Sequence, residues 1–245
     1  MTEVLCIGTS DAFGSGGRRQ SAYLVRAPAG GVLVDCGTTT GTGLAALGVA
    51  RDELDAVLVS HFHADHFGGI PLLLLAAQYL DARVKPLRIA GPADIERRVR
   101  GAATALGHPM ENQDWSFPIL FQELSPGRES AVGPVVVTPF ETRHSPDSHP
   151  HGLAIGTGTR RLVYSGDTGW FDGLPRHAKG ADLFLCECTL AHPSFEYHLS
   201  LEELAAQRHR FDCGRMLLTH LGEEMRSLTD HLGFEVADDG MVIKL

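Results

Sequence analysis

The stretch of sequence that decides the fold follows the apolar run 56–59 and reads Ser60-His61-Phe62-His63-Ala64-Asp65-His66-Phe67-Gly68-Gly69. Three imidazoles and one carboxylate fall within six positions, where a buried strand is expected to give way to a loop. Neutral imidazole and carboxylate together suit zinc or a similar first-row metal. A solvated loop that is merely rich in histidine is the alternative, but polar groups at this density beside a buried strand are typical of ligation.

The spacing within this stretch divides the donors into two sets. His61 and His63 are two residues apart, so they point the same way if the strand persists, and one ion can take both. Asp65 and His66 lie on the turn beyond and can serve a second ion. The two glycines that follow then let a helix begin close to the site.

Three further donors each stand at the end of an apolar run. They are His144 after residues 135–140, Asp167 after residues 162–166, and His220 after residues 216–219. A single histidine after a strand is usually structural. The same placement three times, however, matches the tendency of binding sites to gather at strand ends.

The rest of the chain alternates short β-rich runs with segments of helical spacing. The expected strands are 4–7, 22–26, 32–35, 56–60, 87–90, 135–138, 153–157, 162–165, 183–186 and 216–219. The expected helices are 43–47, 68–80, 93–106, 201–211 and 223–232. Two sheets covered by helices on the outside would satisfy this pattern.

Two segments carry expectations of a different kind. The end of the chain is predicted to form a β-hairpin, with 234–236 and 241–243 joined around Asp238-Asp239-Gly240. Residues 112–133 are the least regular and are predicted to be surface loop. Because the sequence contains no internal repeat and no linker, residues 1–245 are expected to form a single domain.

The composition limits the class of protein. The chain has 245 residues and a formal charge of −9, and a chain of this length builds its core without disulfides or a structural metal. The acidic balance argues against a large electrostatic footprint for nucleic acid. No apolar run reaches the ~18–20 residues that cross a bilayer, and the start lacks an export signal. We therefore expect a cytoplasmic protein whose five cysteines are reduced.

The donor pattern resembles that of the metallo-β-lactamase fold superfamily of hydrolases. The match consists of HxHxDH at 61–66, His144, the aspartate of Ser165-Gly166-Asp167-Thr168 and the histidine of Leu218-Thr219-His220. The resemblance implies an α/β fold of the four-layer αββα type with two divalent metals at one edge, zinc being expected and manganese the alternative. It implies one metal bound by His61, His63 and His144. The other would be bound by Asp65, His66 and His220, with Asp167 bridging both.

Within the superfamily, the sequence looks most like the ribonuclease Z and phosphodiesterase branch. Ile7-Gly8-Thr9-Ser10 and Arg19-Gln20-Ser21 are similar to the first loop of that branch. The run Cys186-Glu187-Cys188-Thr189, followed by His198, is similar to its glutamate at a strand end and the histidine that opens a helix. In that branch the pair works near the leaving group, which implies catalytic roles for Glu187 and His198 beside Asp65. An ordinary helix start, capped by Ser200 and Glu203, is the alternative for His198.

Two departures from that branch bear on the substrate. Only 22 residues separate His144 from Asp167, which leaves no room for the long arm with which ribonuclease Z grips transfer RNA. Cys186 stands where that family usually has histidine. The sequence therefore favours hydrolysis of a smaller phosphodiester, such as a cyclic nucleotide or a short RNA, by a metal-bridging hydroxide. The alternatives are a transfer-RNA 3′ endonuclease, a lactonase or other carbonyl-ester or lactam hydrolase, and a non-catalytic metal-dependent binding protein.

A few other residues are candidates for contact with substrate. His149 and His151 either rim the cleft or lie on an exposed turn. Arg18 and Arg19, on the glycine-rich first loop, are candidates for phosphate contacts. We expect no membrane partner. Relatives in this branch are often homodimers, so homodimer formation is a further prediction.

Overall fold

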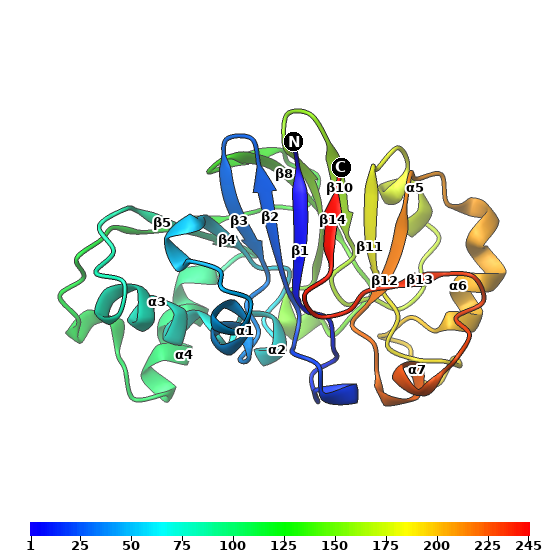
Figure 1. Ribbon diagram of the computed structural model, residues 1–245, viewed down its shortest axis with the longest axis horizontal. Helices are drawn as coiled ribbons and strands as arrows, with labels where there is room; N and C mark the ends of the chain where they lie inside the picture. Colours follow the sequence, from blue (N-terminus) through cyan, green and yellow to red (C-terminus); the bar gives the residue numbers. More distant parts are fainter.

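Two seven-stranded sheets form the centre of the computed structural model, which describes residues 1–245 throughout (Figure 1). The first sheet has the strand order β14 (Val242–Lys244), β1 (Glu3–Gly8), β2 (Ala22–Ala27), β3 (Gly30–Val34), β4 (Leu54–Leu58), β5 (Leu87–Gly91) and β6 (Ile119–Glu123). The second has the order β13 (Glu235–Val236), β12 (Met216–Thr219), β11 (Leu183–Glu187), β10 (Arg161–Tyr164), β9 (His151–Gly156), β8 (Val135–Glu141) and β7 (Ser130–Val132).

Helices cover the outer face of each sheet. The first sheet carries α1 (Thr40–Ala46) and α2 (Ala64–Phe67), near the lower middle of Figure 1, and α3 (Ile70–Tyr79) and α4 (Ile95–Ala105), at its left. The second carries α5 (Leu174–Ala178), α6 (Leu201–Gln207) and α7 (Glu223–Ser227), at the right. Single 3₁₀ turns occupy Ser15–Gly17, Arg51–Glu53, Met110–Asn112, Pro146–Ser148 and Arg208–Arg210.

Three apolar layers hold these elements together, and strand β1 shows how the sequence builds them. Its side chains alternate, so Val4 and Cys6 join the apolar layer between the two sheets. Leu5 and Ile7 face the opposite way, into the layer beneath α1 and α3. A third layer lies between the second sheet and its helices. The order of layers is therefore helix, sheet, sheet, helix, which confirms the αββα expectation.

The regular elements were largely predictable from the sequence, but three expectations differ from the structure. The chain end is not a hairpin: β13 pairs with β12 in the second sheet, and β14 pairs with β1 in the first. The segment 112–133 is not all loop, because it contains the two edge strands β6 and β7. The helix expected at 223–232 ends early, at Ser227.

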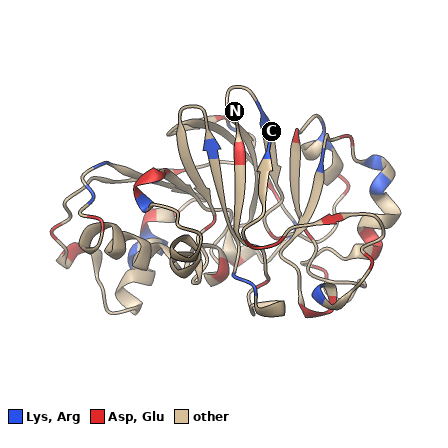
Figure 2. Cartoon of the chain, viewed as in Figure 1, with Lys and Arg blue, Asp and Glu red and all other residues tan.

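Charges of both signs are spread along the fold. Figure 2 shows Lys and Arg interspersed with Asp and Glu along both halves of the chain. Many of the arginines are paired with a carboxylate, as in Arg26 with Glu3 and Arg51 with Asp81. None of the helices is both long and apolar enough to span a membrane.

Candidate metal centre

All seven donors that the sequence singled out meet at one edge of the sandwich. Four of them, His61, His63, Asp65 and His66, lie on the loop after β4 and on α2. The other three follow β8, β10 and β12 and are His144, Asp167 and His220. Their donor atoms form two groups, and within each group all the atoms lie within 4.8 Å of one another.

The first group contains His61, His63, His144 and Asp167. The Nδ1 atom of His63 lies 3.2 Å from Nε2 of His61 and 3.0 Å from Nε2 of His144. Oδ2 of Asp167 lies 3.7 Å from His61 and 3.8 Å from His144. Strand β4 ends at Leu58, so the two histidines of the HxH pair face the same point from a loop and not from a continued strand.

The second group contains Asp65, His66, Asp167 and His220. Nε2 of His66 lies 3.2 Å from Oδ2 of Asp65, 3.2 Å from Oδ1 of Asp167 and 3.4 Å from Nε2 of His220. The two oxygens of Asp167 therefore face different groups, which is the arrangement that a bridging carboxylate requires.

These spacings fit a metal better than they fit hydrogen bonds. Donors held at about 2.0–2.1 Å from a tetrahedral zinc ion lie roughly 3.4 Å from one another. The nitrogen and oxygen distances in both groups cluster near that value. In addition, Oδ1 of Asp167 is buried without a hydrogen-bond partner. The residues present therefore suit one cation in each group.

Neighbouring protein groups hold the imidazoles in place through hydrogen bonds. His66 directs Nδ1 to Asp35, 2.7 Å away, and Asp35 also accepts hydrogen bonds from the Ser60 backbone and hydroxyl and from Tyr164. Nδ1 of His144 lies 2.9 Å from the carbonyl oxygen of Tyr197. Such partners fix the ring that would bind a metal.

Asp35 was missed by the sequence analysis, although its position carries a signal. It is a carboxylate directly after the apolar strand β3, it is fully buried, and its backbone has the left-handed φ of 58°. A short polar residue tolerates that conformation better than a bulky one. A second missed residue is Thr189, whose hydroxyl lies 2.9 Å from Nδ1 of His220 and 2.9 Å from Glu187.

Glycine lets the helical side of the site pack closely. A Cβ atom on Gly69 would lie 2.2 Å from the carbonyl oxygen of Gly37, far inside normal contact. Cys36 accepts a hydrogen bond from Gly69 and donates one to His66. The expectation that the glycines bring the helical segment close to the site is therefore confirmed.

Carboxylates dominate the electrostatics of the second group. Burial opposes a charge on His66, but Asp167, Asp65 and Asp35 raise its pKa well above the ordinary value. Burial would raise the pKa of Asp65, but His66 and His220 hold it well below its usual range. The carboxylates are thus ionised at neutral pH, as cation binding requires.

In the first group, burial has the larger effect. Desolvation lowers the pKa of His61 well below its ordinary value, helped by the proximity of His66. Burial also lowers the pKa of His63 and of His144. These imidazoles are consequently neutral at pH 7, which is the form that binds a metal.

Glu187 and His198 lie together beside both groups. Oε1 of Glu187 is 2.8 Å from Nδ1 of His198, and Glu187 is fully buried and accepts hydrogen bonds from the backbones of Thr168 and Thr189. The His198 ring stacks on His220 with centroids 5.6 Å apart. Burial lowers the pKa of His198, but Glu187 outweighs it and raises the value to about 9.

The helix-capping alternative for this region is also present in the structure, but it involves other atoms. The Ser200 hydroxyl accepts a hydrogen bond from the backbone of Glu203, and Glu203 accepts one from the backbone of Ser200. His198 takes no part in this capping box. The cap starts α6 and leaves the His198 ring beside the metal donors.

The secondary candidates fall into two groups. His149 and His151 line a small hollow together with His144, and Nδ1 of His151 is buried without a partner. Arg18 forms an ion pair with Asp238, and the backbone of Arg19 donates to Asp239. The two arginines therefore brace the chain end, and the histidines rim the site.

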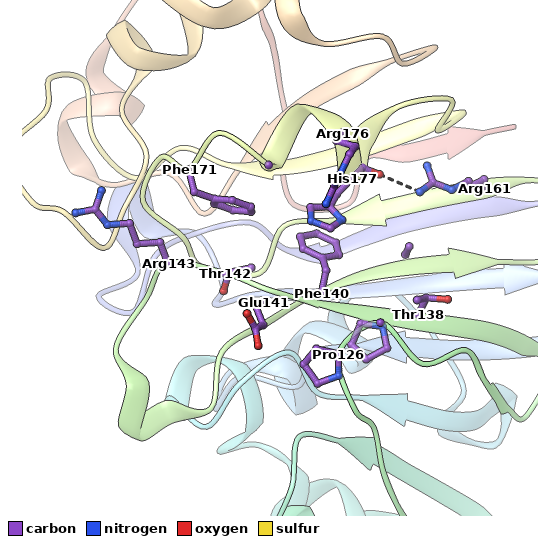
Figure 3. A pocket seen from close by; sticks show the side chains of 14 residues that line it. Pro126, Thr138, Phe140, Glu141, Thr142, Arg143, Arg161, Phe171, Arg176 and His177 are labelled. Atoms are coloured by element: carbon purple, nitrogen blue, oxygen red, sulfur yellow. Dashed lines mark hydrogen bonds between the residues drawn. The ribbon is translucent and has the colours of Figure 1, made fainter.

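The largest cavity, about 1000 Å³, contains none of the seven donors. Figure 3 shows it between β8 and α5, where the rings of Phe140 and His177 are stacked. Arg161 donates to the carbonyl oxygen of His177 and closes one side. The chemistry of the donor cluster is therefore separate from the largest hollow.

Sequence comparison finds a matching protein family and several related proteins. The family model described as "Anti-Pycsar protein Apyc1" matches residues 2–237. A ribonuclease Z of Mycobacterium bovis is 29% identical over 240 residues, which cover 90% of this chain and 86% of that protein. An uncharacterized protein of Mycobacterium leprae, ML1173, is 32% identical over 209 residues, which cover 82% of this chain and 71% of that protein.

Solved structures share the fold over the whole chain. The metallo-β-lactamase fold protein YhfI of Bacillus subtilis is 26% identical, with a TM-score of 0.79 and complete coverage of both chains. The short form of human tRNase Z has a TM-score of 0.78 at 23% identity and covers 99% of this chain and 98% of its own. A diphosphatase of the PhnP family has a TM-score of 0.80 at 14% identity, with 100% and 98% covered. The last two similarities concern the fold alone.

Proposed function

Because the chain belongs to the anti-Pycsar protein Apyc1 family, among the metallo-β-lactamase fold hydrolases, we propose that it is a dinuclear metal-dependent phosphodiesterase. Its substrate would be a small phosphodiester, such as a cyclic nucleotide or a short RNA. The observation that carries the proposal is the Glu187–His198 pair, held at 2.8 Å beside both donor groups. An alkoxide leaves phosphorus poorly without a proton, and this pair places a protonated imidazole next to the donors.

Two divalent cations would be held by the two groups of donors. His61, His63 and His144 would hold one; Asp65, His66 and His220 would hold the other; and Asp167 would reach both. Zinc suits this mixture of imidazole and carboxylate, and manganese is the alternative. When bound, such ions lower the pKa of water and offset the charge of a phosphoryl group.

The protein side chains then supply orientation and protons. Asp65 has one oxygen 3.2 Å from both His66 and His220, and it would also orient the attacking water. His198, whose Nδ1 is held by Glu187, would present its Nε2–H to the leaving oxygen and protonate it. Buried Glu187 would keep the imidazole in the tautomer and position that this transfer needs.

Two features favour a small substrate over transfer RNA. Residues 144–167 form a short connection through β9 and β10, without an added arm. Lys and Arg are interspersed with Asp and Glu along the chain, and the formal charge is −9 (Figure 2). Phosphate contacts with a large RNA depend on clustered Lys and Arg. A small diester needs no such surface.

The first experiment is hydrolysis of bis(p-nitrophenyl) phosphate by zinc- and manganese-loaded protein, with a lactone and a nitrocefin-type lactam in parallel. We expect metal-dependent cleavage of the diester in preference to the other two. The control is His66→Ala, which removes a donor that also anchors Asp35 and should abolish turnover. Cleavage of the lactone or lactam without diester cleavage would assign the protein to the carbonyl hydrolases. Metal binding with no turnover at all would favour a binding protein.

A further inference from the structure

A hollow of about 320 Å³ is lined in part by His198 and by none of the seven metal donors. The residues that shape it include Arg143, Trp170, Ser194, Phe195, Glu196 and His198. It is distinct from the large cavity between β8 and α5, with which it shares Arg143. Because it adjoins His198, this hollow is a candidate binding pocket for part of the substrate.

Phe195 forms one wall and is unusually exposed for an apolar ring. Its side chain is 54% exposed, and its ring centroid lies 5.8 Å from that of His198 and 5.5 Å from that of Tyr197. Large aromatic side chains that remain exposed at the rim of a site commonly serve recognition. Phe195 therefore presents a flat apolar surface directly beside the proposed proton donor.

The segment that carries Phe195 is fixed by its neighbours. The backbone of His198 donates to the carbonyl oxygen of Phe195. The carbonyl oxygen of Glu196 packs so tightly on Gly169 that a Cβ atom there would lie 1.8 Å away. The ring is thus held in place before any ligand arrives, which reduces the entropy lost on binding.

The rest of the lining combines a second aromatic residue with charged side chains. Trp170 is partly buried, because its ring packs edge-on against Phe211 and lies 5.3 Å from the Arg210 guanidinium. Arg143 donates to the Trp170 carbonyl oxygen and, at 2.7 Å, to Glu196. The rim therefore offers both hydrogen-bond donors and an acceptor above two aromatic residues.

We propose that this hollow is the subsite for the leaving-group side of the substrate and takes a flat aromatic ring stacked on Phe195. That the hollow receives the leaving group, and not the group retained on phosphorus, rests on the proposed function, in which His198 protonates the leaving oxygen. A hollow of about 320 Å³ is large enough for one ring system, such as a nucleobase or an aryl group. The charged pair Arg143–Glu196 lies where the polar edge of such a ring would reach.

Binding can be measured without turnover. In a Trp115→Phe background the only tryptophan is Trp170, and a nitrophenyl ring bound nearby quenches its fluorescence. The probe is p-nitrophenyl phosphate, titrated into metal-loaded protein. We expect saturable quenching, and about tenfold weaker affinity in Phe195→Ala, since stacking on one aromatic ring is worth that much. Phe195→Tyr should restore the affinity. Leu80→Ala, which removes an even more exposed apolar side chain directly after α3, should leave it unchanged.

Kinetic measurements then show whether the hollow binds the leaving group or the group retained on phosphorus. Bis(p-nitrophenyl) phosphate and methyl p-nitrophenyl phosphate share the leaving group but differ in the group retained on phosphorus. We expect Phe195→Ala to raise KM about tenfold for both substrates. An increase for the bis-aryl substrate alone would place the retained group in the hollow and overturn the proposal.

The outcomes separate this inference from the proposed function. If neither diester is hydrolysed, the proposed function fails, and the fluorescence titration still decides whether the hollow takes an aromatic ring. Equal affinities of Phe195→Ala and the parent protein, or no quenching of Trp170, would overturn the subsite whatever the turnover.

Discussion

His198 is the residue on which the mechanism depends most. We expect His198→Ala to lower kcat about 10²-fold for a substrate that releases an alkoxide, because the proton donor is lost. For bis(p-nitrophenyl) phosphate the loss should be smaller, since p-nitrophenolate leaves readily without a proton. The measurements are kcat for 3′,5′-cyclic AMP and for the nitrophenyl diester, together with bound metal per chain.

His198 belongs to neither of the two groups proposed to hold ions, although it forms a third cluster of possible donors with Glu187 and His220, and we expect bound metal to stay unchanged in this variant. An equal loss for both substrates would argue against proton donation. An unchanged kcat for both would leave His198 with only a packing role beside His220.

His151 links the rim of the site to stability at acid pH. Burial lowers its pKa to about 4, so it is neutral in the folded protein, while in the unfolded chain it titrates near 6.5. Its stabilising contribution is therefore fully present above pH 6.5 and is lost as the pH falls towards 4. In metal-free protein, the free energy of unfolding should fall between pH 7.5 and pH 4. We expect this fall to be about 2–3 kcal/mol smaller in His151→Gln than in wild type.

Urea unfolding at several pH values checks this expectation. His149→Gln is the matched control, since His149 is two residues away but not buried. Parallel pH profiles for wild type and His151→Gln would show that the unpartnered ring contributes nothing to acid sensitivity.

At the scale of elements, the short helix α6 depends on its capping box. Ser200 and Glu203 satisfy backbone N–H groups that the first turn would otherwise leave unpaired. We expect Ser200→Ala to lower the free energy of unfolding by about 1 kcal/mol. Thermal or urea unfolding measures this, and Ser200→Asp, which retains an acceptor, should recover most of the loss. No change in Ser200→Ala would mean that packing alone holds the helix.

The elements that could be predicted from the sequence are those with a local signature. HxHxDH after an apolar strand located the main donors, and alternation of apolar residues located most of the strands. The prediction of a terminal hairpin was wrong, because the residues Asp238-Asp239-Gly240 are typical of a hairpin turn when only the local sequence is considered. In the structure the two aspartates pair with Arg18 and Arg19, and the chain crosses there from one sheet to the other.

Strands β6 and β7 escaped prediction for a related reason. Both lie at sheet edges, where one side of the ladder is unpaired and burial is partial. Their sequences, Ile-Leu-Phe-Gln-Glu and Ser-Ala-Val, are too short or too polar at their ends to stand out from a loop. Asp35 and Thr189 were missed because orienting a ligand requires only a buried polar atom, for which no sequence pattern is specific.

Over the whole molecule, the donor groups join the two halves of the chain. His61 and His63 come from the first half, whereas His144, Asp167 and His220 come from the second. Each ion bound there would stabilise the folded protein by about 3–4 kcal/mol at 100–1000 times its dissociation constant. We expect chelation to lower Tm by several degrees in wild type and much less in His66→Ala. Differential scanning calorimetry checks this, and an equal shift in the variant would contradict it.

The same arrangement bears on the prediction that residues 1–245 form one domain. The apolar layer between the sheets draws side chains from both halves, among them Val4, Leu58, Leu153 and Leu217. One cooperative unfolding transition is therefore expected, and two transitions would divide the chain. Whether the protein is a homodimer also stays a prediction, which analytical ultracentrifugation would decide.

The pairing of β14 with β1 brings the two ends of the chain together. Leu245 donates a backbone hydrogen bond to Thr2, and both ends lie at the edge of the sandwich opposite α1 and α2 (Figure 1). Strand β1 runs in the same direction as β4, so its beginning lies at the end of the sheet remote from His61. The protein is thus suited to circular permutation: a short peptide could join residue 245 to residue 1, and new ends could be opened in a surface turn without disturbing the donors.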